Sequence, residues 1–488
     1  MTLKDLFPTI EFSTDITIHN IQNDSRHANK DTLFVAFTGF EIDVHDFIDD
    51  AYQHGCRYFL VAQDRFVALQ DSYRDALFIP SVNLKEDMSQ VILKFYNYPD
   101  KELVLIGITG TNGKTTTATL INQSLQLMGA KTACFGTVEW VVGDIVYPAP
   151  NTTPDFLTLI KLLRQAIDQK VTHVIMEVAS HALDLGRVEN LNFDCALFTN
   201  LTQDHLDYHG TFEKYYRVKS QLFLKLLAQS CNKNKKSFVN ADDLYGQRLL
   251  KELGERGIPT TSLSIEGQGV WNATNINLTI NNTEFTLSNG EISIAVNSNL
   301  LGMINVQNIM MAFVLLRHLG YSDDNILFYI PNITILGRLQ KVHSPKGVVF
   351  LVDYAHTPDA LEKVISVVNN TLSSGKKSIV VFGAGGDRDT CKRPLMAQAT
   401  KNAHIKIVTS DNPRTEDPKL IIQDIMRGFD SMTNIYQEID RVQAIRLAYQ
   451  KADQGDVILV AGKGHENYQI IGKSKIHFSD IEEIQKLL

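Results

Sequence analysis

Short continuous apolar runs constrain the fold of this chain more than any other feature of its sequence. Such runs, bounded by polar turns, are typical of parallel strands buried on both faces of a sheet. They occur at 103–109, 173–179, 195–201 and 237–240, and the pattern restarts at 347–355, 378–384, 405–410 and 456–462. Longer amphipathic stretches separate them, as helices do. The sequence therefore predicts an α/β fold with two mostly parallel, helix-flanked sheets.

The 488 residues exceed what one hydrophobic core holds, so we expect several domains. We predict three: a smaller N-terminal α/β domain at 1–98, a central domain at 99–336 and a Rossmann-like C-terminal α/β domain at 337–488. Within the central domain, 270–300 alternates apolar and polar residues between Asn and Gly turns. That pattern predicts an antiparallel meander.

The composition excludes several classes of protein. A net charge of −8 and a pI of about 6.0 argue against a dedicated nucleic-acid or anionic-membrane binder. No apolar run approaches the ~20 residues of a membrane helix, and the N-terminus lacks the pattern of a signal peptide. The cysteines are scattered and odd in number, as reduced thiols would be: Cys56, Cys134, Cys195, Cys231 and Cys391. We therefore expect a soluble cytoplasmic protein.

The segment GITGTNGKTTT (107–117) lies where a predicted strand ends and a helix begins. Gly110 and Gly113 would make a turn whose backbone amides surround phosphate oxygens, and Lys114 adds a mobile cation. The Thr115 hydroxyl stands where it can ligate Mg²⁺. The alternative is a glycine-rich turn that binds nothing. A phosphate loop alone leaves kinases, GTPases, ATPases and ligases open.

Two further segments, 176–187 and 200–220, each follow a predicted strand. Glu177 and His205 at these strand ends are candidate ligands of a nucleotide-linked metal ion. Taken alone, Glu177 could instead cap a helix, and His205 could be an ordinary hydrogen-bonded side chain.

With GTNGKTT, EVASHAL and NLTQDHLDYHG in this order, the chain resembles the Mur ligases, and among them the MurE group of UDP-N-acetylmuramoyl-tripeptide synthetases. The similarity spans nearly the whole chain, because it continues through GMINVQNIMMA, GRLQKV, VDYAHTPDALEKV, FGAGGDRDTCKRPLM, TSDNPRTEDP and VAGKGHENYQI. The resemblance implies an N-terminal domain for the UDP end of the substrate, a central ATPase domain and a C-terminal domain for an amino acid.

The resemblance also implies a reaction of peptidoglycan precursor synthesis. ATP would phosphorylate the D-Glu side-chain carboxylate of UDP-MurNAc-L-Ala-D-Glu, and the amine of an incoming amino acid would then displace phosphate. A carboxylate is a poor electrophile until phosphate is its leaving group. Because ATP and the carboxylate are both anions, Mg²⁺ (at two sites) and lysines are needed to offset their charge.

Individual roles follow from the resemblance alone. The expected catalytic residues are Lys114, Glu177, His205 and Lys219, and the expected metal ligands are Thr115, Glu177, His205 and Lys219. ATP is expected on Gly110, Thr111, Asn112, Gly113, Lys114, Thr115, Thr116, Asn305, Arg338 and Asp353, with His356 in the loop of the last. Lys219 matches a lysine that the family carries as a carbamate, which forms only from a neutral amine, so the site must lower its pKa. On its own Lys219 would be read as a solvent-facing helix lysine.

For the UDP-MurNAc moiety the resemblance implies contacts from Asn23, Ser25, Asn151, Thr152, Thr153, Ser180 and Arg187. His181 is also available there. Two positions depart from many relatives: Ala179 replaces a serine, and Leu185 stands where some relatives have glutamine.

The added amino acid is expected to be meso-diaminopimelate rather than L-lysine, which lacks the distal carboxylate. Arginine matches a carboxylate bidentately, and a site built for that group rejects the analogue without it. The matching positions are Arg388, Asp411, Asn412, Pro413, Arg414, Gly462 and Glu466, with Glu466 suited to an ammonium group. On composition alone Arg414 would be an exposed turn arginine paired with Glu416 or Asp417.

Three other functions stay open at this point. The chain could be another ligase of the superfamily, such as a folylpolyglutamate synthetase or one of the adjacent Mur ligases, or an inactive binding protein that retains the fold. It could also be a P-loop kinase. We expect a monomer that binds small molecules, with no nucleic acid and no membrane insertion.

Overall fold

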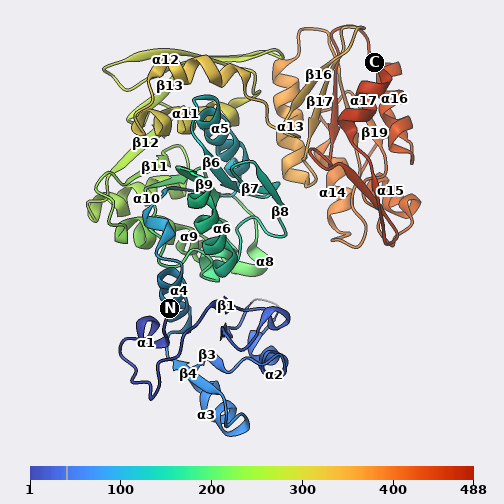
Figure 1. Cartoon of the computed structure of the whole chain (residues 1–488). Coiled ribbons are helices and arrows are strands. Elements are labelled where there is room, and N and C mark those ends of the chain that lie inside the picture. The colour runs from blue at the N-terminus through green and yellow to red at the C-terminus, as the bar shows by residue number, and fades with distance from the viewer. Residues whose placement is uncertain (40–41) are drawn as a thin grey trace. The chain divides into compact units, whose positions relative to one another are not determined.

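The computed structural model describes residues 1–39 and 42–488 (Figure 1). Met1–Asn272 and Met311–Tyr321 form one compact unit, the first unit; Ala273–Met310 and Ser322–Leu488 form the second unit. The predicted α/β class is confirmed, with two large sheets that are mostly parallel. The division into three domains stays a prediction.

The N-terminal part of the first unit is built on a four-stranded, fully parallel sheet in the order β1-β2-β3-β4. Phe34, Phe59 and Phe78 pack ring against ring in its core. The elements are α1 (Leu3–Leu6), β1 (Asn20–Gln22), η1 (Ser25–His27), β2 (Thr32–Val35), η2 (Val44–Phe47), α2 (Ile48–Gln53), β3 (Tyr58–Ala62), α3 (Gln63–Ser72), β4 (Leu77–Ser81), α4 (Leu84–Phe95) and η3 (Pro99–Lys101).

A second sheet of the first unit runs in the order β12-β11-β10-β5-β9-β6-β7-β8. Its strands are parallel from β12 to β6, and β7 and β8 continue it as an antiparallel hairpin. The strands are β5 (Val104–Thr109), β6 (Thr132–Phe135), β7 (Glu139–Val142), β8 (Ile145–Pro148), β9 (His173–Glu177), β10 (Cys195–Phe198), β11 (Lys236–Asn240) and β12 (Thr260–Ser264).

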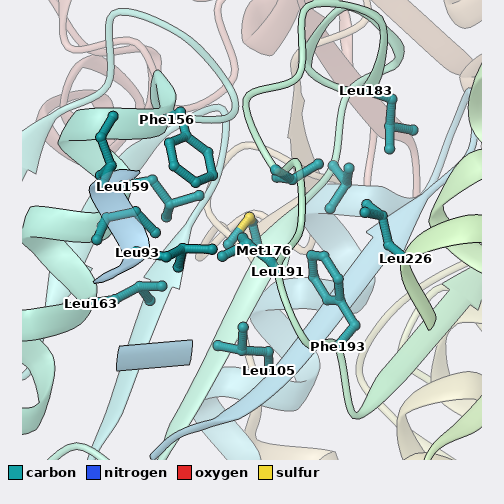
Figure 2. Close-up of a cluster of buried hydrophobic side chains, with 14 of the residues drawn as sticks. Leu93, Leu105, Phe156, Leu159, Leu163, Met176, Leu183, Leu191, Phe193 and Leu226 are labelled. Carbon is teal, nitrogen blue, oxygen red and sulfur yellow. The ribbon is translucent and has the colours of Figure 1, made fainter. Parts of the chain in front are cut away.

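Helices with an apolar face bury this sheet. Figure 2 shows Phe156, Leu159 and Leu163 of one helix packed with Met176 of β9 and Leu105 of β5. Their spacing of three and four residues places them on one side of the helix. The helices are α5 (Lys114–Leu127), α6 (Phe156–Asp168), α7 (Ser180–Asp184), α8 (Leu206–His209), α9 (Phe212–Gln221), the π-helical η4 (Leu222–Leu227) and α10 (Leu244–Glu255).

The second unit begins with the predicted meander, in which β14 pairs antiparallel with β15. Asn-rich turns separate the strands, as expected for residues that tolerate tight turns. The elements are β13 (Trp271–Leu278), which starts in the first unit, β14 (Thr283–Ser288), β15 (Ser293–Ser298), α11 (Met303–His318), which ends in the first unit, α12 (Asp323–Tyr329) and η5 (Ile330–Asn332).

A six-stranded sheet forms the rest of the second unit, in the order β16-β17-β21-β18-β19-β20, and only β16 is antiparallel. Alternate residues of its strands face two apolar layers: α13, α14 and α15 cover one side, and α16 and α17 cover the other (Figure 1). The sheet is therefore doubly wound. The elements are β16 (Gln340–His343), β17 (Val349–Asp353), α13 (Pro358–Thr371), β18 (Ser378–Phe382), α14 (Lys392–Ala399), β19 (Ile405–Val408), α15 (Pro418–Met426), β20 (Ile435–Gln437), α16 (Arg441–Lys451), β21 (Val457–Ala461), β22 (Tyr468–Ile471), β23 (Ser474–His477) and α17 (Asp480–Leu487).

The parallel strands bring the polar segments together. In a parallel sheet every carboxyl end lies at the same edge, where ligands of such folds bind. In the first unit this edge carries the segments after β5, β6, β9 and β10, and in the second unit the segments after β17, β18, β19 and β21. All five cysteines are free. Within the described residues, no helix has both the length and the apolar composition needed to span a bilayer.

Candidate active site

The glycine-rich segment forms a compact loop between β5 and α5. Gly110 has a φ of +148°, and a Cβ built there would lie 1.9 Å from Thr199 Oγ1, so only glycine fits. The Thr111 amide donates to the Asn200 carbonyl at 2.9 Å, and the Asn112 amide donates to the Asn200 side-chain oxygen at 2.9 Å. The loop is thus fixed by the segment that follows β10.

The predicted cation of the loop lies inside it. Lys114 Nζ donates to the carbonyl oxygens of Gly110 and Thr111, both at 3.0 Å. Gly113, with a φ of +86°, precedes the first residue of α5. Amides at a helix N-terminus favour anions, so the loop and α5 together can hold phosphate. Thr116, also predicted to bind ATP, is buried in the first turn of α5.

Glu177 is buried at the end of β9, and three donors hold its carboxylate. Thr115 Oγ1 donates to Oε2 at 3.0 Å, the Thr137 amide donates to Oε1 at 3.1 Å, and Thr137 Oγ1 donates to Oε2 at 3.2 Å. The structure thus brings the predicted metal ligands Thr115 and Glu177 into direct contact. A hydroxyl and a carboxylate are hard oxygen ligands of the kind that Mg²⁺ takes.

Lys219 is the second lysine of the loop. Its side chain comes from α9, is 1% exposed, and donates from Nζ to the Gly110 carbonyl at 2.8 Å. Nζ also lies 4.7 Å from the centre of the Tyr215 ring. Burial, and then the nearby Lys114 cation, hold the pKa of Lys219 well below its usual range. The simple reading of Lys219 as a solvent-facing helix lysine is therefore wrong.

His205 has a left-handed backbone (φ +50°) and a half-exposed side chain beside Asp204, with 3.4 Å between Nε2 and Oδ2. Its ring lies edge-to-face with that of His181, with 5.0 Å between the ring centres. Across the described residues, no hydrogen bond joins His205 to Thr115, Glu177 or Lys219. The four predicted metal ligands are thus brought together only in part.

A cavity of about 900 Å³ lies in the first unit, between the N-terminal sheet and the segments after β8 and β9. The cavity lining includes His181, and it also includes Ala179 and Leu185, the two positions that depart from the family pattern. Arg187 Nη1 donates to the Thr153 carbonyl at 3.0 Å, and burial lowers the pKa of its guanidinium. Six of the seven residues predicted to contact UDP-MurNAc line the cavity: Asn23, Ser25, Asn151, Thr152, Thr153 and Arg187.

Ser180 is the seventh residue, and its side chain points elsewhere. It is 2% exposed, and its hydroxyl lies 2.9 Å from His209 Nε2. The His209 ring stacks on Tyr215 at 4.9 Å, and burial, with the neighbouring His181, lowers the pKa of His209 to about 4. His209 is therefore a neutral partner of Ser180 at pH 7.

The remaining predicted nucleotide residues lie in the second unit. Asn305 Nδ2 donates to the Leu301 carbonyl at 2.7 Å. The Arg338 guanidinium lies 5.1 Å from the centre of the Tyr354 ring. The backbone carbonyl of Tyr354 accepts a hydrogen bond from His356 Nδ1. Asp353, at the end of β17, accepts from the amides of Leu339 at 2.9 Å and Ala355 at 2.8 Å, and burial raises its pKa.

The predicted amino-acid site occupies the carboxyl edge of the second unit's sheet. Arg388 is exposed, in the segment after β18. Arg414, after β19, has a φ of +52° and donates from Nη1 to the Gly386 carbonyl at 2.8 Å. No salt bridge involves Arg414 in the part of the chain that the structure describes. The alternative pairing with Glu416 or Asp417 is wrong, because Glu416 pairs with Arg393 and Asp417 caps α15.

Beside Arg414 lies a buried polar cluster. Lys463 Nζ, fully buried, donates to Glu466 Oε2 at 3.0 Å, and Asn412 Nδ2 donates to the same oxygen at 3.0 Å. Asp411 Oδ1 is 4.0 Å from Lys463 Nζ, and burial raises the pKa of Asp411. A Cβ at Gly462 would lie 2.6 Å from Asp411 Oδ2. Pro413 is also buried in this loop.

The sequence did not point to three residues that hold others in place. Thr137 holds Glu177, Asn200 holds the phosphate loop, and Lys463 holds Glu466. Thr137 and Asn200 follow strands that neighbour β9 and β5 in the sheet. Their position just after short apolar runs was the available signal. Lys463 lies in the quoted segment VAGKGHENYQI, but its burial has no sequence pattern.

Known families match two stretches of the chain: residues 108–316 match the Mur ligase middle domain, and residues 337–464 match the Mur ligase, glutamate ligase domain. The UDP-N-acetylmuramoyl-L-alanyl-D-glutamate--2,6-diaminopimelate ligase of Fusobacterium nucleatum is 39% identical, over 98% of this chain and 96% of its own length. The ligase of the same name from Geobacillus kaustophilus is 40% identical over 94% and 92%.

Solved structures show the same relationship. A UDP-N-acetylmuramoyl-L-alanyl-D-glutamate--2,6-diaminopimelate ligase superposes with a TM-score of 0.74 at 30% identity, covering 100% of this chain and 98% of that one. The folylpolyglutamate synthase of Mycobacterium tuberculosis, complexed with ADP and AMPPCP, superposes at 0.61 but is 15% identical, and covers 76% of this chain and 91% of its own. That second likeness shows the fold alone. This chain therefore belongs to the MurE group of the Mur ligase family and is an ATP-dependent ligase of peptidoglycan precursor synthesis.

Proposed function

We propose that this ligase joins meso-2,6-diaminopimelate to the D-Glu side-chain carboxylate of UDP-MurNAc-L-Ala-D-Glu, through an acyl phosphate. The observation that carries the choice of amino acid is Arg414. Its guanidinium lies in the loop after β19, held by a neutral carbonyl rather than a carboxylate. The curated relatives whose names specify 2,6-diaminopimelate support the same choice.

The 900 Å³ cavity is the proposed site of the UDP-MurNAc moiety. Its size suits a large ligand, and its lining combines apolar side chains such as Phe37 and Ile42 with hydroxyls, amides and the cation Arg187. Such a lining suits a sugar nucleotide, which presents both rings and phosphate oxygens. Asn151, Thr152 and Thr153 lead from this cavity to Glu177, since Thr153 Oγ1 donates to the Glu177 carbonyl at 2.7 Å.

ATP is proposed to bind at the phosphate loop, with Lys114 on its β- and γ-phosphates. The residues present fit a nucleotide with Mg²⁺. At Gly110 the loop packs so closely on Thr199 that a Cβ is excluded, and Thr115 already contacts Glu177. Bound Mg²⁺ would offset phosphate charge and polarise the γ-phosphoryl group. We propose Thr115, Glu177, His205 and carbamylated Lys219 as its protein ligands, over two sites.

The buried amine of Lys219 supports its carbamylation. Because burial lowers the pKa of Lys219 well below its usual range, more of the amine is in the neutral form, whose nitrogen lone pair can bond to the carbon of CO₂ while one proton leaves to solvent. The product is an anion beside the phosphate loop. It replaces a second cation with a group able to ligate a metal ion.

The proposed reaction has two steps. An oxygen of the D-Glu carboxylate bonds to the γ-phosphorus of ATP, and ADP leaves. The neutral amine of diaminopimelate then bonds to the acyl carbon, phosphate leaves, and a proton passes to solvent. Lys114 lies where it can stabilise the negative charge of the transferring phosphoryl group. Arg414 and Arg388 would bind the distal carboxylate of diaminopimelate, and Glu466 would bind the ammonium group at the same end of that molecule.

The test is phosphate release by the purified protein with ATP, UDP-MurNAc-L-Ala-D-Glu and either meso-diaminopimelate or L-lysine, with the amide product identified by mass. We expect turnover with diaminopimelate, and a kcat/KM for lysine at least about 1000-fold lower, because lysine lacks the carboxylate that Arg388 and Arg414 would bind and so leaves their donors unpaired. Turnover with lysine alone would refute the substrate, and phosphate transfer without an amide product would refute the ligation. We also propose a monomer acting in the cytoplasm, where ATP is available.

A further inference from the structure

The loops 385–389 and 411–416, which carry the two proposed carboxylate-binding arginines, interlock. Arg414 Nη1 donates to the Gly386 carbonyl at 2.8 Å. A Cβ at Gly386 would lie 1.9 Å from the Pro413 carbonyl oxygen, so the two backbones are in contact. The position of one loop therefore depends on that of the other.

Side chains complete the connection between the loops. The Asp387 carboxylate accepts from the Thr415 amide at 3.2 Å and from Thr415 Oγ1 at 2.7 Å. The Asp387 amide donates to Glu416 Oε1 at 2.5 Å. Asp387 and Arg414 both have a φ of +52°, a conformation that costs free energy for residues with a Cβ. These contacts hold both residues in that conformation.

A buried arginine anchors this connection to the fold. Arg393 lies on α14, with a side chain only 2% exposed. One of its terminal nitrogens donates to both oxygens of Glu416, at 2.8 and 2.9 Å, and the other donates to Asp424 of α15 at 3.0 Å. Arg393 therefore connects α14 and α15 to the Glu416 carboxylate, which accepts a hydrogen bond from the Asp387 amide.

Stability alone gives little reason for this arrangement. Buried ion pairs roughly break even against apolar residues of the same size. Within the described residues the Arg393 Nε atom is buried without a hydrogen-bond partner, which adds a further cost. What the pair does supply is a fixed geometry between α14 and both loops.

We propose that Arg393 and Glu416 are positioning residues of the amino-acid site: by clamping the loops 385–389 and 411–416 together they set the spacing of Arg388 and Arg414. The inference rests on the proposed function of those two arginines. Binding of one carboxylate by two guanidinium groups requires both groups to be in place, and small displacements cost much of the binding. The pair therefore governs both affinity for the amino acid and discrimination against an analogue that lacks the distal carboxylate.

The experiment measures the KM for each of the three substrates, and the melting temperature, in Arg393→Met and in the double variant Arg393→Met/Glu416→Met. The double variant leaves no unpaired buried charge, so it is expected to fold. We expect the KM for the amino acid to rise by about 10- to 100-fold in both, and the preference for diaminopimelate over lysine to fall, while the KM values for ATP and UDP-MurNAc-L-Ala-D-Glu stay unchanged.

The matched control is Arg427→Met. Arg427 bonds the other oxygen of Asp424 at 2.7 Å, but it is 73% exposed and does not touch Glu416. Its KM values should equal those of the wild type. A folded double variant with an unchanged KM for the amino acid would overturn the proposal, and so would an equal rise in all three KM values. If the wild-type enzyme adds lysine instead, the proposed substrate is wrong, and the KM for lysine tests the pair.

Discussion

The Nζ atoms of Lys114 and Lys219 converge on one carbonyl oxygen, that of Gly110, at 3.0 and 2.8 Å. Burial, and then repulsion by the Lys114 cation, disfavour the charge of Lys219 and lower its pKa. The two lysines of the loop therefore differ: Lys114 is placed to meet phosphate, and Lys219 gives up its proton more readily than an ordinary lysine.

Lys219→Ala should lower kcat/KM by about 100- to 1000-fold, because it removes an anionic group that the carbamate would place near the metal ion. Labelling with ¹³C-bicarbonate should give a carbamate carbon signal in the wild type. The signal should weaken as the pH falls, since protonated amine cannot react. Lys214→Ala, on the exposed face of α9, is the control and should keep full activity. A wild type without the signal would argue against carbamylation.

Gly110→Ala should abolish binding of a non-hydrolysable ATP analogue in calorimetry, because its Cβ would overlap Thr199 Oγ1. Gly129→Ala is the matched control: Gly129 also has a positive φ, +88°, but has open space around the new methyl group. It should bind the analogue normally and lose only about 1 kcal/mol of stability from backbone strain. Equal nucleotide affinity in the two variants would contradict binding of ATP at the glycine-rich loop.

Arg414→Ala should lose addition of diaminopimelate while ATP binding survives. Removing one partner of a charge pair that substrate binding desolvates costs about 2–5 kcal/mol, so kcat/KM should fall by about 30- to 4000-fold. Arg446→Ala, exposed on α16, removes the same charge elsewhere and should have no effect. Unchanged kinetics in Arg414→Ala would remove the basis for choosing diaminopimelate.

Asp194 should make the first unit less stable as the pH rises from about 4 to 6. Burial raises its pKa to about 6, against about 3.9 in an unfolded chain, so the native state binds more protons in this window. The stabilisation is complete below pH ~4 and is lost above pH ~6. It amounts to about 1–2 kcal/mol, since water partly screens the group.

Melting temperatures measured at several pH values would check this. Asp194→Asn should flatten the dependence of the melting temperature on pH between pH 4 and 6. The control Asp144→Asn, at an exposed position, should leave that dependence as in the wild type. An identical slope in Asp194→Asn and the wild type would show that another group is responsible.

The sequence predicted the parallel strands correctly because strands buried on both faces leave continuous apolar runs. It did not identify β6, β7 and β8, which are only four residues each. Nor does periodicity carry strand order. The contact between Thr137 and Glu177 exists because β6 lies next to β9, and that neighbourhood is a property of the whole sheet.

The same limit applies to charged side chains. Lys219 and the exposed Lys214 lie on one helix, and only tertiary packing makes one of them buried. Glu416 was a candidate partner of Arg414, its neighbour in sequence, yet it pairs with Arg393, twenty-three positions away. Local sequence identifies charges but not which of them a fold brings together.

The doubly wound sheet of the second unit separates the residues that hold the fold from those that we propose bind the amino acid. Its two apolar layers lie along the strands, while Arg388 and Arg414 stand on loops beyond the strand ends. A descendant of this chain could therefore acquire a different amino acid by exchanging loops, with the buried layers inherited intact. Divergence among ligases of this kind would then be recorded in a few short segments, and a cell's wall chemistry could change without a new scaffold having to evolve.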